Sequence, residues 1–170
     1  MIHGFLHHDL SHAPEAYPCP FCLLAQGVIN EDVWSRESDV VYRDQNMLAF
    51  IAAAGWSSNP GHVLVVPVAH FENLYTLPDA LGAQLQMLSR RVALAMKVAY
   101  GCPGTSTRQH NEPGSGQDVW HFHMHIFPRW PDDGLYSGLE RRRIPLDQRA
   151  GHADQLRPAM QQVLAELPLP

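Results

Sequence analysis

The sequence contains little cysteine, a minority of basic residues and no long apolar run, and each shortage excludes a class of protein. Three cysteines in 170 residues do not make a disulfide framework. Twelve Lys and Arg residues against 17 acidic ones give a net charge of −5, which argues against a general nucleic-acid coat but not against a small phosphorylated ligand. No apolar run has the length of a membrane span, and the first residues do not form a signal peptide. We therefore expect a cytoplasmic protein that binds neither nucleic acid nor membranes.

The composition that remains is that of one folded domain. With 45% hydrophobic and 17% charged residues, the chain can bury a sizeable core. Residues 1–17 are rich in His and Pro and predict an irregular, loosely held N-terminal extension; its histidines are His3, His7, His8 and His12. We expect the main domain to span 18–135, and a C-terminal loop and helix at 136–170 to pack on it.

The middle of the chain alternates between strand and helix patterns. Two β-rich runs at 40–42 and 47–51 flank a short polar turn and predict a hairpin. The apolar run at 62–67 follows a loop at 55–61 and predicts a buried strand, and a short strand is possible at 105–107.

Two helices are predicted by apolar residues at three- and four-residue steps. The first begins near Pro78, ends at Gly101 and carries its apolar stripe at Leu81, Leu85, Leu88, Val92 and Met96. The second spans roughly 153–167 and buries Leu156, Met160, Val163 and Leu164. The order of elements predicts an α+β fold with a meander sheet, one long helix and a C-terminal helix.

Three histidines alternate with large apolar residues in the segment 121–127, His-Phe-His-Met-His-Ile-Phe. In an extended strand, successive side chains point to opposite faces, so the three imidazoles would lie together and the apolar residues would face a core. Histidine ligates metals, transfers protons and acts as a nucleophile. The pattern alone also fits a metal-binding or merely solvated strand face.

A second motif, Cys19-Pro20-Phe21-Cys22, places two thiols on one turn, a spacing that suits tetrahedral zinc and also occurs in redox sites. Pro18 and the loose segment before it do not suit a thioredoxin-like site. Two further zinc ligands would be imidazoles, and the candidates are His62, His70, His110, His121, His123 and His125.

Taken together, these motifs resemble the histidine triad family of nucleotide-binding hydrolases and transferases, in its zinc-containing bacterial form. The resemblance covers about residues 18–130 and is carried by four segments in the family's order: the Cys19–Cys22 pair, Asn59-Pro60-Gly61-His62 with the strand after it, His70-Phe71-Glu72-Asn73-Leu74, and Gly116-Gln117 leading through the three histidines to Pro128-Arg129. It implies a five-stranded antiparallel sheet with the long helix, and a homodimer.

The resemblance assigns a separate role to each histidine of the triad. His123 matches the nucleophile that takes the α-phosphoryl group as a covalent nucleotidyl-histidine, and His125 matches the residue that holds the α-phosphate. His121 and His70 match the ligands that complete a structural Zn²⁺ site with the cysteine pair, Cys19 and Cys22.

Other positions match the family's substrate contacts. Gly116 and Gln117 match the loop that contacts phosphate, His62 matches a histidine behind the phosphate site, and Phe50 matches an apolar residue near the base. The residue aligned with the loop's usual Asn or Gln is His110 by direct count and Asn111 if one deletion is allowed; we favour Asn111.

Three features leave roles open. The family's usual ribose-binding Asp is replaced by Ala52, which puts nucleotide preference in doubt. The stretch from Phe50 to His62 is longer than usual, and its Trp56 either stacks on the base or serves packing or a dimer contact. Asp118 either protonates the leaving group or solvates the end of its loop.

The resemblance therefore implies an enzyme that cleaves a nucleoside monophosphate, with a purine base, from a phosphoanhydride or phosphoramidate through His123. Dinucleoside polyphosphates and nucleoside phosphoramidates are the expected substrates. The alternatives are a catalytically weak nucleotide-binding or interaction module of the same fold, and a zinc hydrolase, which would need an open metal position.

Overall fold

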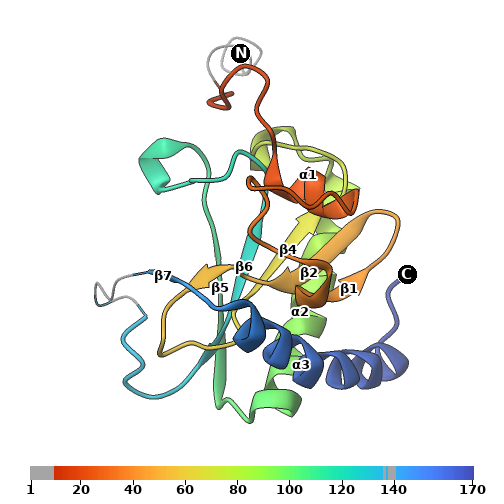
Figure 1. Cartoon of the computed structure of the whole chain (residues 1–170). Helices are drawn as coiled ribbons and strands as arrows, with labels where there is room; N and C mark the ends of the chain where they lie inside the picture. The colour runs from red at the N-terminus through yellow and green to blue at the C-terminus, as the bar shows by residue number, and fades with distance from the viewer. Residues whose placement is uncertain (1–9, 136, 138–140) are drawn as a thin grey trace.

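The computed structural model describes residues 10–135, 137 and 141–170 (Figure 1). The predicted role of His3, His7 and His8 in a loose extension lies outside the described residues. The described helices and strands are α1 (Pro20–Ala25), β1 (Val40–Arg43), β2 (Met47–Ile51), β3 (Ala54–Gly55), β4 (Val63–Pro67), α2 (Asp79–Tyr100), β5 (Gly104–Gln109), β6 (Met124–Arg129), β7 (Arg142–Arg143) and α3 (Leu146–Glu166). Short 3₁₀ turns lie at Glu37–Asp39, Leu74–Thr76 and Pro113–Ser115.

The five main strands form one antiparallel sheet in the order β1-β2-β4-β6-β5, which confirms the predicted α+β fold. The order departs from a strict meander, because α2 carries the chain from β4 past one position to the edge strand β5, and β6 then returns between them. This return places β6, the strand of the histidine triad, beside β4 at the centre of the sheet.

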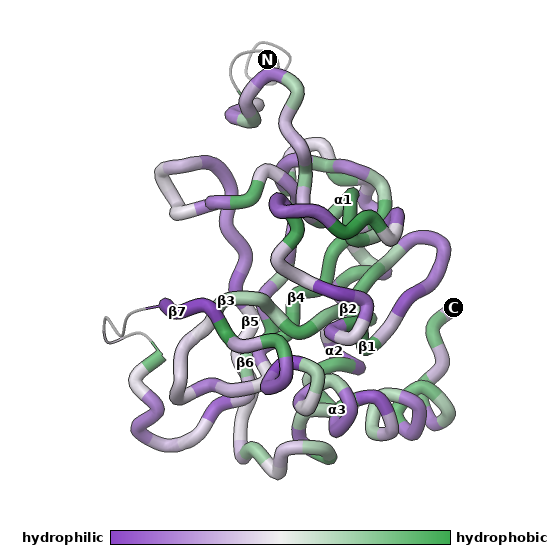
Figure 2. The backbone as a smooth tube through the Cα atoms, in the orientation of Figure 1, coloured by the Kyte–Doolittle hydropathy of each residue, from purple (hydrophilic) through white to green (hydrophobic). Residues whose placement is uncertain are grey.

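Both faces of the sheet are covered, which explains why β2 and β4 are buried along their whole length. On one face, Ile51, Val63 and Val65 pack in a core with apolar residues of α2 and α3. On the other, Phe50 and Leu64 pack with Phe21 of α1 and its neighbours. Figure 2 shows the hydrophobic colour along β2, β4 and α1, whereas α3 alternates between polar and apolar residues.

The triad segment is a strand only in its second half. β6 begins at Met124 rather than at His121, so the predicted strand is wrong at its start. Its ladder with β4 ends at the pair Val65↔Met124, and Pro67 of β4 has no N–H with which to continue it. His121 and His123 therefore lie on an extended lead-in whose backbone is not committed to the sheet.

Several predicted boundaries also shift. The C-terminal helix begins at Leu146, seven residues before the predicted start at 153, because Pro145 is accommodated at its N-cap and Asp147 occupies its first turn. β5 spans six residues instead of three. Gly55, predicted as the first residue of a loop, belongs to the two-residue strand β3, which pairs with β7.

The described part of the N-terminal extension is held in place. The Glu72 carboxylate accepts hydrogen bonds from the Ser11 hydroxyl and the His12 amide, each at 2.6 Å. The Asn73 side chain donates to the Leu10 carbonyl at 2.7 Å. Residues 10–12 thus differ from the loose segment that composition predicts. Among the described residues, no helix has the length and apolar character that a membrane crossing requires.

Candidate active site and metal group

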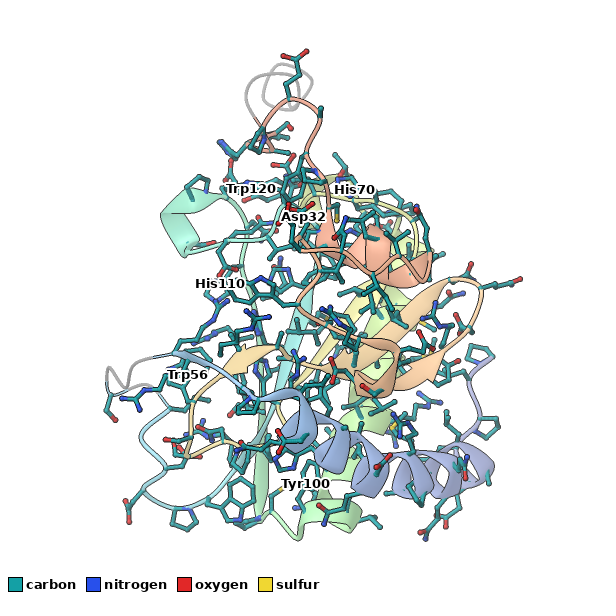
Figure 3. All side chains as sticks on the ribbon, viewed as in Figure 1. Asp32, Trp56, His70, Tyr100, His110 and Trp120 are labelled. Carbon is teal, nitrogen blue, oxygen red and sulfur yellow. The ribbon has the colours of Figure 1, made fainter. Side chains whose placement is uncertain are left out.

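Four predicted metal ligands come together from three separate parts of the chain. Cys19 and Cys22 lie at the start of α1, His70 follows β4, and His121 precedes β6. Their ligand atoms all lie within 4.8 Å of one another. Figure 3 labels His70 near α1, where its Nδ1 lies 3.3 Å from the Cys22 sulfur.

The spacing of these atoms suits a tetrahedral cation. The Nδ1 of His121 lies 3.2 Å from the Cys19 sulfur and 3.5 Å from the Cys22 sulfur. Ligands bonded to zinc at about 2.0–2.3 Å stand roughly 3.3–3.8 Å apart in a tetrahedron. Burial and the neighbouring Cys19 raise the pKa of the Cys22 thiol to about 12, so a bound cation would have to displace a proton from it.

The ring of His121 has its orientation fixed by the backbone of β4. Its Nε2 lies 2.9 Å from the Pro67 carbonyl, which can only accept, so the proton sits on Nε2 and the Nδ1 lone pair points to the two sulfurs. Burial lowers the pKa of His121 to about 3. A neutral imidazole with this tautomer is a competent metal ligand.

The same reasoning fixes the tautomer of His123. Its Nδ1 donates to the carbonyl of His121 at 2.7 Å, which leaves the Nε2 lone pair for the cavity that the ring lines. The ring is 3% exposed, and burial lowers its pKa below the usual value of a histidine. A neutral imidazole held at one nitrogen is a nucleophile at the other.

His125 belongs to a row of stacked rings. Its Nδ1 lies 2.9 Å from the Nε2 of His62, and both rings stack on Phe127. Burial lowers the pKa of His62 to about 3 and that of His125 well below its usual value. Both rings are therefore neutral and share one proton across this contact.

Aromatic groups extend the row on both sides. Trp56 lies beside His62, with ring centroids 6.4 Å apart, and His110 lies beside His125 at 5.8 Å (Figure 3). The Arg108 guanidinium sits 5.1 Å from the centroid of Trp56 and 5.2 Å from that of Phe127. His123 and His125 thus form part of a wall of packed rings, and the Arg108 guanidinium beside this wall carries a positive charge.

Three rings of this wall, those of His62, His123 and His125, form the floor of a cavity of about 430 Å³, a volume within the range of small-molecule sites. The remaining lining residues are Tyr17, Pro18, Pro20, Phe21, Glu31, Asp32, Val33, Trp34, Ser35, Ala52, Ala53, Ala54, Trp56, Leu64, Asp118, Val119 and Arg141. The lining therefore has an apolar and aromatic part and, besides the histidines, the charged side chains of Glu31, Asp32, Asp118 and Arg141.

Four residues expected to bind substrate do not line this cavity. Phe50 is completely buried, 5.4 Å from Phe21 between ring centroids, and Phe21 lines the cavity in its place. Gly116 has φ +87°, a left-handed conformation in which glycine is favoured, and it ends the 3₁₀ turn of the loop. Gln117 ties the loop together, since it accepts from the Glu112 amide at 2.8 Å and donates to the Glu72 carbonyl at 2.6 Å.

The fourth is Asn111, whose side chain forms hydrogen bonds within the protein. Its side-chain oxygen accepts from the Leu74 amide at 2.8 Å, and its amide donates to Gln109 at 2.9 Å. These contacts hold the loop onto the 3₁₀ turn at Leu74–Thr76. His110, not Asn111, is the residue beside His125.

Sequence reasoning did not find the roles of Trp34 and Arg141 in the cavity wall. Arg141 was part of a basic run, Arg141-Arg142-Arg143, that predicts only a solvated surface. The three side chains are indeed exposed, but Arg141 pairs with Asp118 at 2.5 Å and the Arg143 guanidinium lies 4.7 Å from the centroid of Trp34. No signal in the sequence relates these residues, because they are separated by about 20 to 110 positions.

A buried polar network supports the turn that leads to His62. The Asn59 amide donates to the Pro128 carbonyl at 2.9 Å and to the Asp133 carboxylate at 2.8 Å. Asp133 also forms a two-pronged ion pair with Arg129, which lowers the pKa of that carboxyl far below its usual range. The ends of β6 and β4 are thereby fixed to each other.

Comparisons with known proteins agree with this geometry. A family model described as the HIT domain matches residues 35–132. The "Protein hit" of Bacillus subtilis is 35% identical over 112 residues, which cover 66% of this chain and 71% of that protein. An adenylylsulfatase of Arabidopsis thaliana is 27% identical over 139 residues, which cover 78% of this chain and 64% of that one. A zinc-bound histidine triad family protein of Mycobacterium smegmatis superposes with a TM-score of 0.72 at 25% identity, over 88% of this chain and 97% of that chain.

Proposed function

This chain belongs to the histidine triad (HIT) family, whose members in general hydrolyse or transfer nucleotides. We propose that it is a nucleotidyl hydrolase or transferase. Its substrate would be a nucleoside monophosphate joined to a second group by a phosphoanhydride or phosphoramidate bond. The observation that carries the proposal is the tautomer of His123, which presents an Nε2 lone pair to the cavity.

In the first step, the Nε2 lone pair of His123 forms a bond to the α-phosphorus, and the bond from phosphorus to the leaving group breaks with its electron pair. A phosphoanhydride releases an oxyanion in this step, whereas the amine of a phosphoramidate also takes up a proton from solvent as it leaves. The ring becomes a cation, which the His121 carbonyl stabilises through the Nδ1–H. In the second step, water attacks phosphorus, the N–P bond breaks, its electrons return to Nε2, and the proton lost by water passes to solvent. For transfer, another acceptor takes the place of water.

His125 would donate a hydrogen bond to the charge that develops on the phosphate. When His62 donates to the Nδ1 of His125, the Nε2 of His125 carries its proton toward the cavity. His110, which lies beside His125, would complete the phosphate side. Loss of one preorganised donor of this kind typically lowers the rate by about 10²–10³.

Zinc fits the group of Cys19, Cys22, His70 and His121, since two thiolates and two imidazoles are a closed tetrahedral set. The metal would supply structural stability and no open coordination position. These residues join α1 to the lead-in of β6, so they would fix the position of His123 two residues further on. The zinc-bound mycobacterial relative supports this assignment.

The apolar part of the cavity lining would hold the nucleoside. Phe21, Val33, Trp34 and Leu64 offer the walls for a purine base, and Trp56 lies closer to the histidine floor. Ala52 lines the cavity without a polar side chain, so no carboxylate at that position binds the ribose. We also propose that two copies of the chain form a homodimer, which sedimentation equilibrium would test: a monomer mass at micromolar concentration would contradict it.

The decisive experiment is mass spectrometry of enzyme quenched during a single turnover of a dinucleoside polyphosphate and of a nucleoside phosphoramidate. We expect a nucleotidyl adduct on the peptide that contains His123, and no adduct or turnover with His123→Ala. His152→Ala, a histidine of α3 that contacts Tyr100 outside the cavity, is the matched control and should retain activity. Nucleotide binding without turnover would instead support the binding module, and turnover without an adduct would refute the covalent mechanism.

A further inference from the structure

Two segments that depart from the family pattern are joined in the structure. The long stretch between Phe50 and His62 contains β3, and the basic run near the C-terminus contains β7. The two strands pair through Ala54↔Arg143 and Gly55↔Arg142, and the Ile144 amide donates to the Ala53 carbonyl at 2.9 Å. The pairing fixes the backbone next to Arg141 against the wall of the cavity.

Arg141 lines the same cavity that has His123 in its floor. Its guanidinium lies 2.5 Å from the Asp118 carboxylate, and the two side chains are 43% and 49% exposed, whereas His123 is 3% exposed. The ion pair is therefore accessible to solvent, whereas the nucleophile is buried. An exposed ion pair contributes little to stability, so an anion can compete for the guanidinium at little cost.

In phosphoryl transfer, the attacking and leaving atoms lie roughly in line across phosphorus. Because the His123 nitrogen attacks from the floor, the leaving group departs away from it, and Arg141 is the basic side chain of the described lining, histidines apart, that can bind it. A guanidinium has five donors and can bind an oxyanion while one prong still contacts Asp118.

Two guanidiniums lie near the floor and can bind an anion there. That of Arg141 lines the cavity, and that of Arg108 lies 5.1 Å from the centroid of Trp56, which also lines it. The acidic residues of the lining are Glu31, Asp32 and Asp118, and of these Asp118 accepts a hydrogen bond from Arg141. An amine leaving group needs a proton, whereas phosphate or sulfate leaves as a stable anion without one, and a guanidinium binds such an anion without giving up a proton.

We infer that Arg141 is the residue that binds the leaving group, and that it selects substrates whose leaving group is an oxyanion, such as a nucleotide polyphosphate or sulfate, over substrates whose leaving group is an amine. The inference rests on the proposed function of the His123 site. In the reaction, the P–O bond breaks, the electron pair stays on the departing oxygen, and Arg141 donates hydrogen bonds to that anion. Asp118 is a positioning residue that holds Arg141 at the cavity.

The test compares kcat/KM for two substrate classes that share the same adenylyl group. Diadenosine tetraphosphate and adenosine 5′-phosphosulfate have anionic leaving groups, and an adenosine 5′-phosphoramidate of a primary amine has a neutral one. We expect Arg141→Ala to lower kcat/KM about 10- to 100-fold for the anionic class, somewhat less than loss of a fully buried oxyanion donor. The phosphoramidate should change less than about threefold, which a merely structural role of Arg141 would not produce.

Two further variants complete the design. Arg141→Lys keeps the charge and should restore part of the activity with anionic leaving groups. Arg142→Ala removes the same charge from the adjacent residue, which is not part of the cavity wall, and should leave both classes unchanged. Equal loss for both classes in Arg141→Ala, or no loss in either, would overturn the inference, as would a wild-type preference for the phosphoramidate that Asp118→Asn abolishes. Failure of the wild type to cleave any substrate would instead contradict the proposed function.

Discussion

Replacement of Asp133 by alanine should disrupt the hydrogen-bond network that joins the ends of β4 and β6, and should lower the free energy of unfolding. The carboxylate accepts five hydrogen bonds: two from Arg129, one from Asn59, and one each from the backbone amides of Trp130 and Leu135. Its side chain is 2% exposed and that of Arg129 is 23% exposed. Truncation removes the acceptor of two guanidinium N–H groups and one of the two acceptors of the Asn59 amide, and breaking such a buried pair costs about 3–5 kcal/mol.

Urea unfolding followed by the fluorescence of the four tryptophans measures this change. At a slope of about 2 kcal/mol per molar, the midpoint should fall by roughly 1.5–2.5 M with the slope unchanged. Asp133→Asn keeps the shape but loses the charge and should fall between the wild type and Asp133→Ala. A loss below about 1 kcal/mol in Asp133→Ala would show that water replaces the carboxylate and that the network contributes little.

The same carboxyl makes stability depend on pH in a defined direction. Its pKa is lowered in the folded state, above all by the hydrogen bond from Arg129. The stabilisation is therefore complete above the unfolded pKa of about 3.9 and is lost as the pH falls below it toward the folded value. Between pH 7 and pH 3, the free energy of unfolding should decrease more in the wild type than in Asp133→Asn. Parallel curves would contradict this assignment.

Three further predictions concern the metal group, the ribose and one turn. Replacing Cys19 and Cys22 by serine should abolish zinc binding in metal analysis and lower the melting temperature before it changes kcat; zinc retained by the double variant would contradict the site. Ala52→Asp should improve kcat/KM for ribonucleotide over 2′-deoxyribonucleotide substrates, between which the wild type should discriminate weakly. Gly61→Ala should destabilise the protein by more than about 1 kcal/mol in thermal unfolding, because Gly61 has φ +79° and a Cβ there would lie 2.7 Å from the Tyr100 ring.

The parts of the fold that the sequence predicts are those with strong local patterns. The apolar stripe from Leu81 to Met96 predicts α2, and the continuous apolar run before Pro67 predicts β4, because burial on both faces removes polar residues from a strand. The start of β6 could not be predicted from alternation alone. It depends on its partner, since the β4 ladder stops near Pro67 whatever pattern the triad segment has.

The metal group shows how much of a site can be predicted from the spacing of residues in the sequence. Cys19 and Cys22 are a local pair, and His121 adjoins the triad, so the motif and the family resemblance together identify them. The orientation of His121 toward the sulfurs is set by the Pro67 carbonyl, 54 positions away in the chain, and only the fold supplies it. The same holds for Asn111 and His110, whose contacts with Leu74 and His125 could not be predicted from an alignment ambiguous by one residue.

The leaving-group side of the cavity was the least predictable part, because it rests on two strands of two residues each. Ala54–Gly55 and Arg142–Arg143 carry no hydrophobic alternation, and a run of arginines is typical of solvated surface. Each segment gains its structure from the other, and their pairing brings a basic residue from beyond the family's matched region, 35–132, to the cavity that His123 and His125 line. In the proposed mechanism, the triad determines how the phosphorus is attacked, and the C-terminal return of the chain determines which group departs.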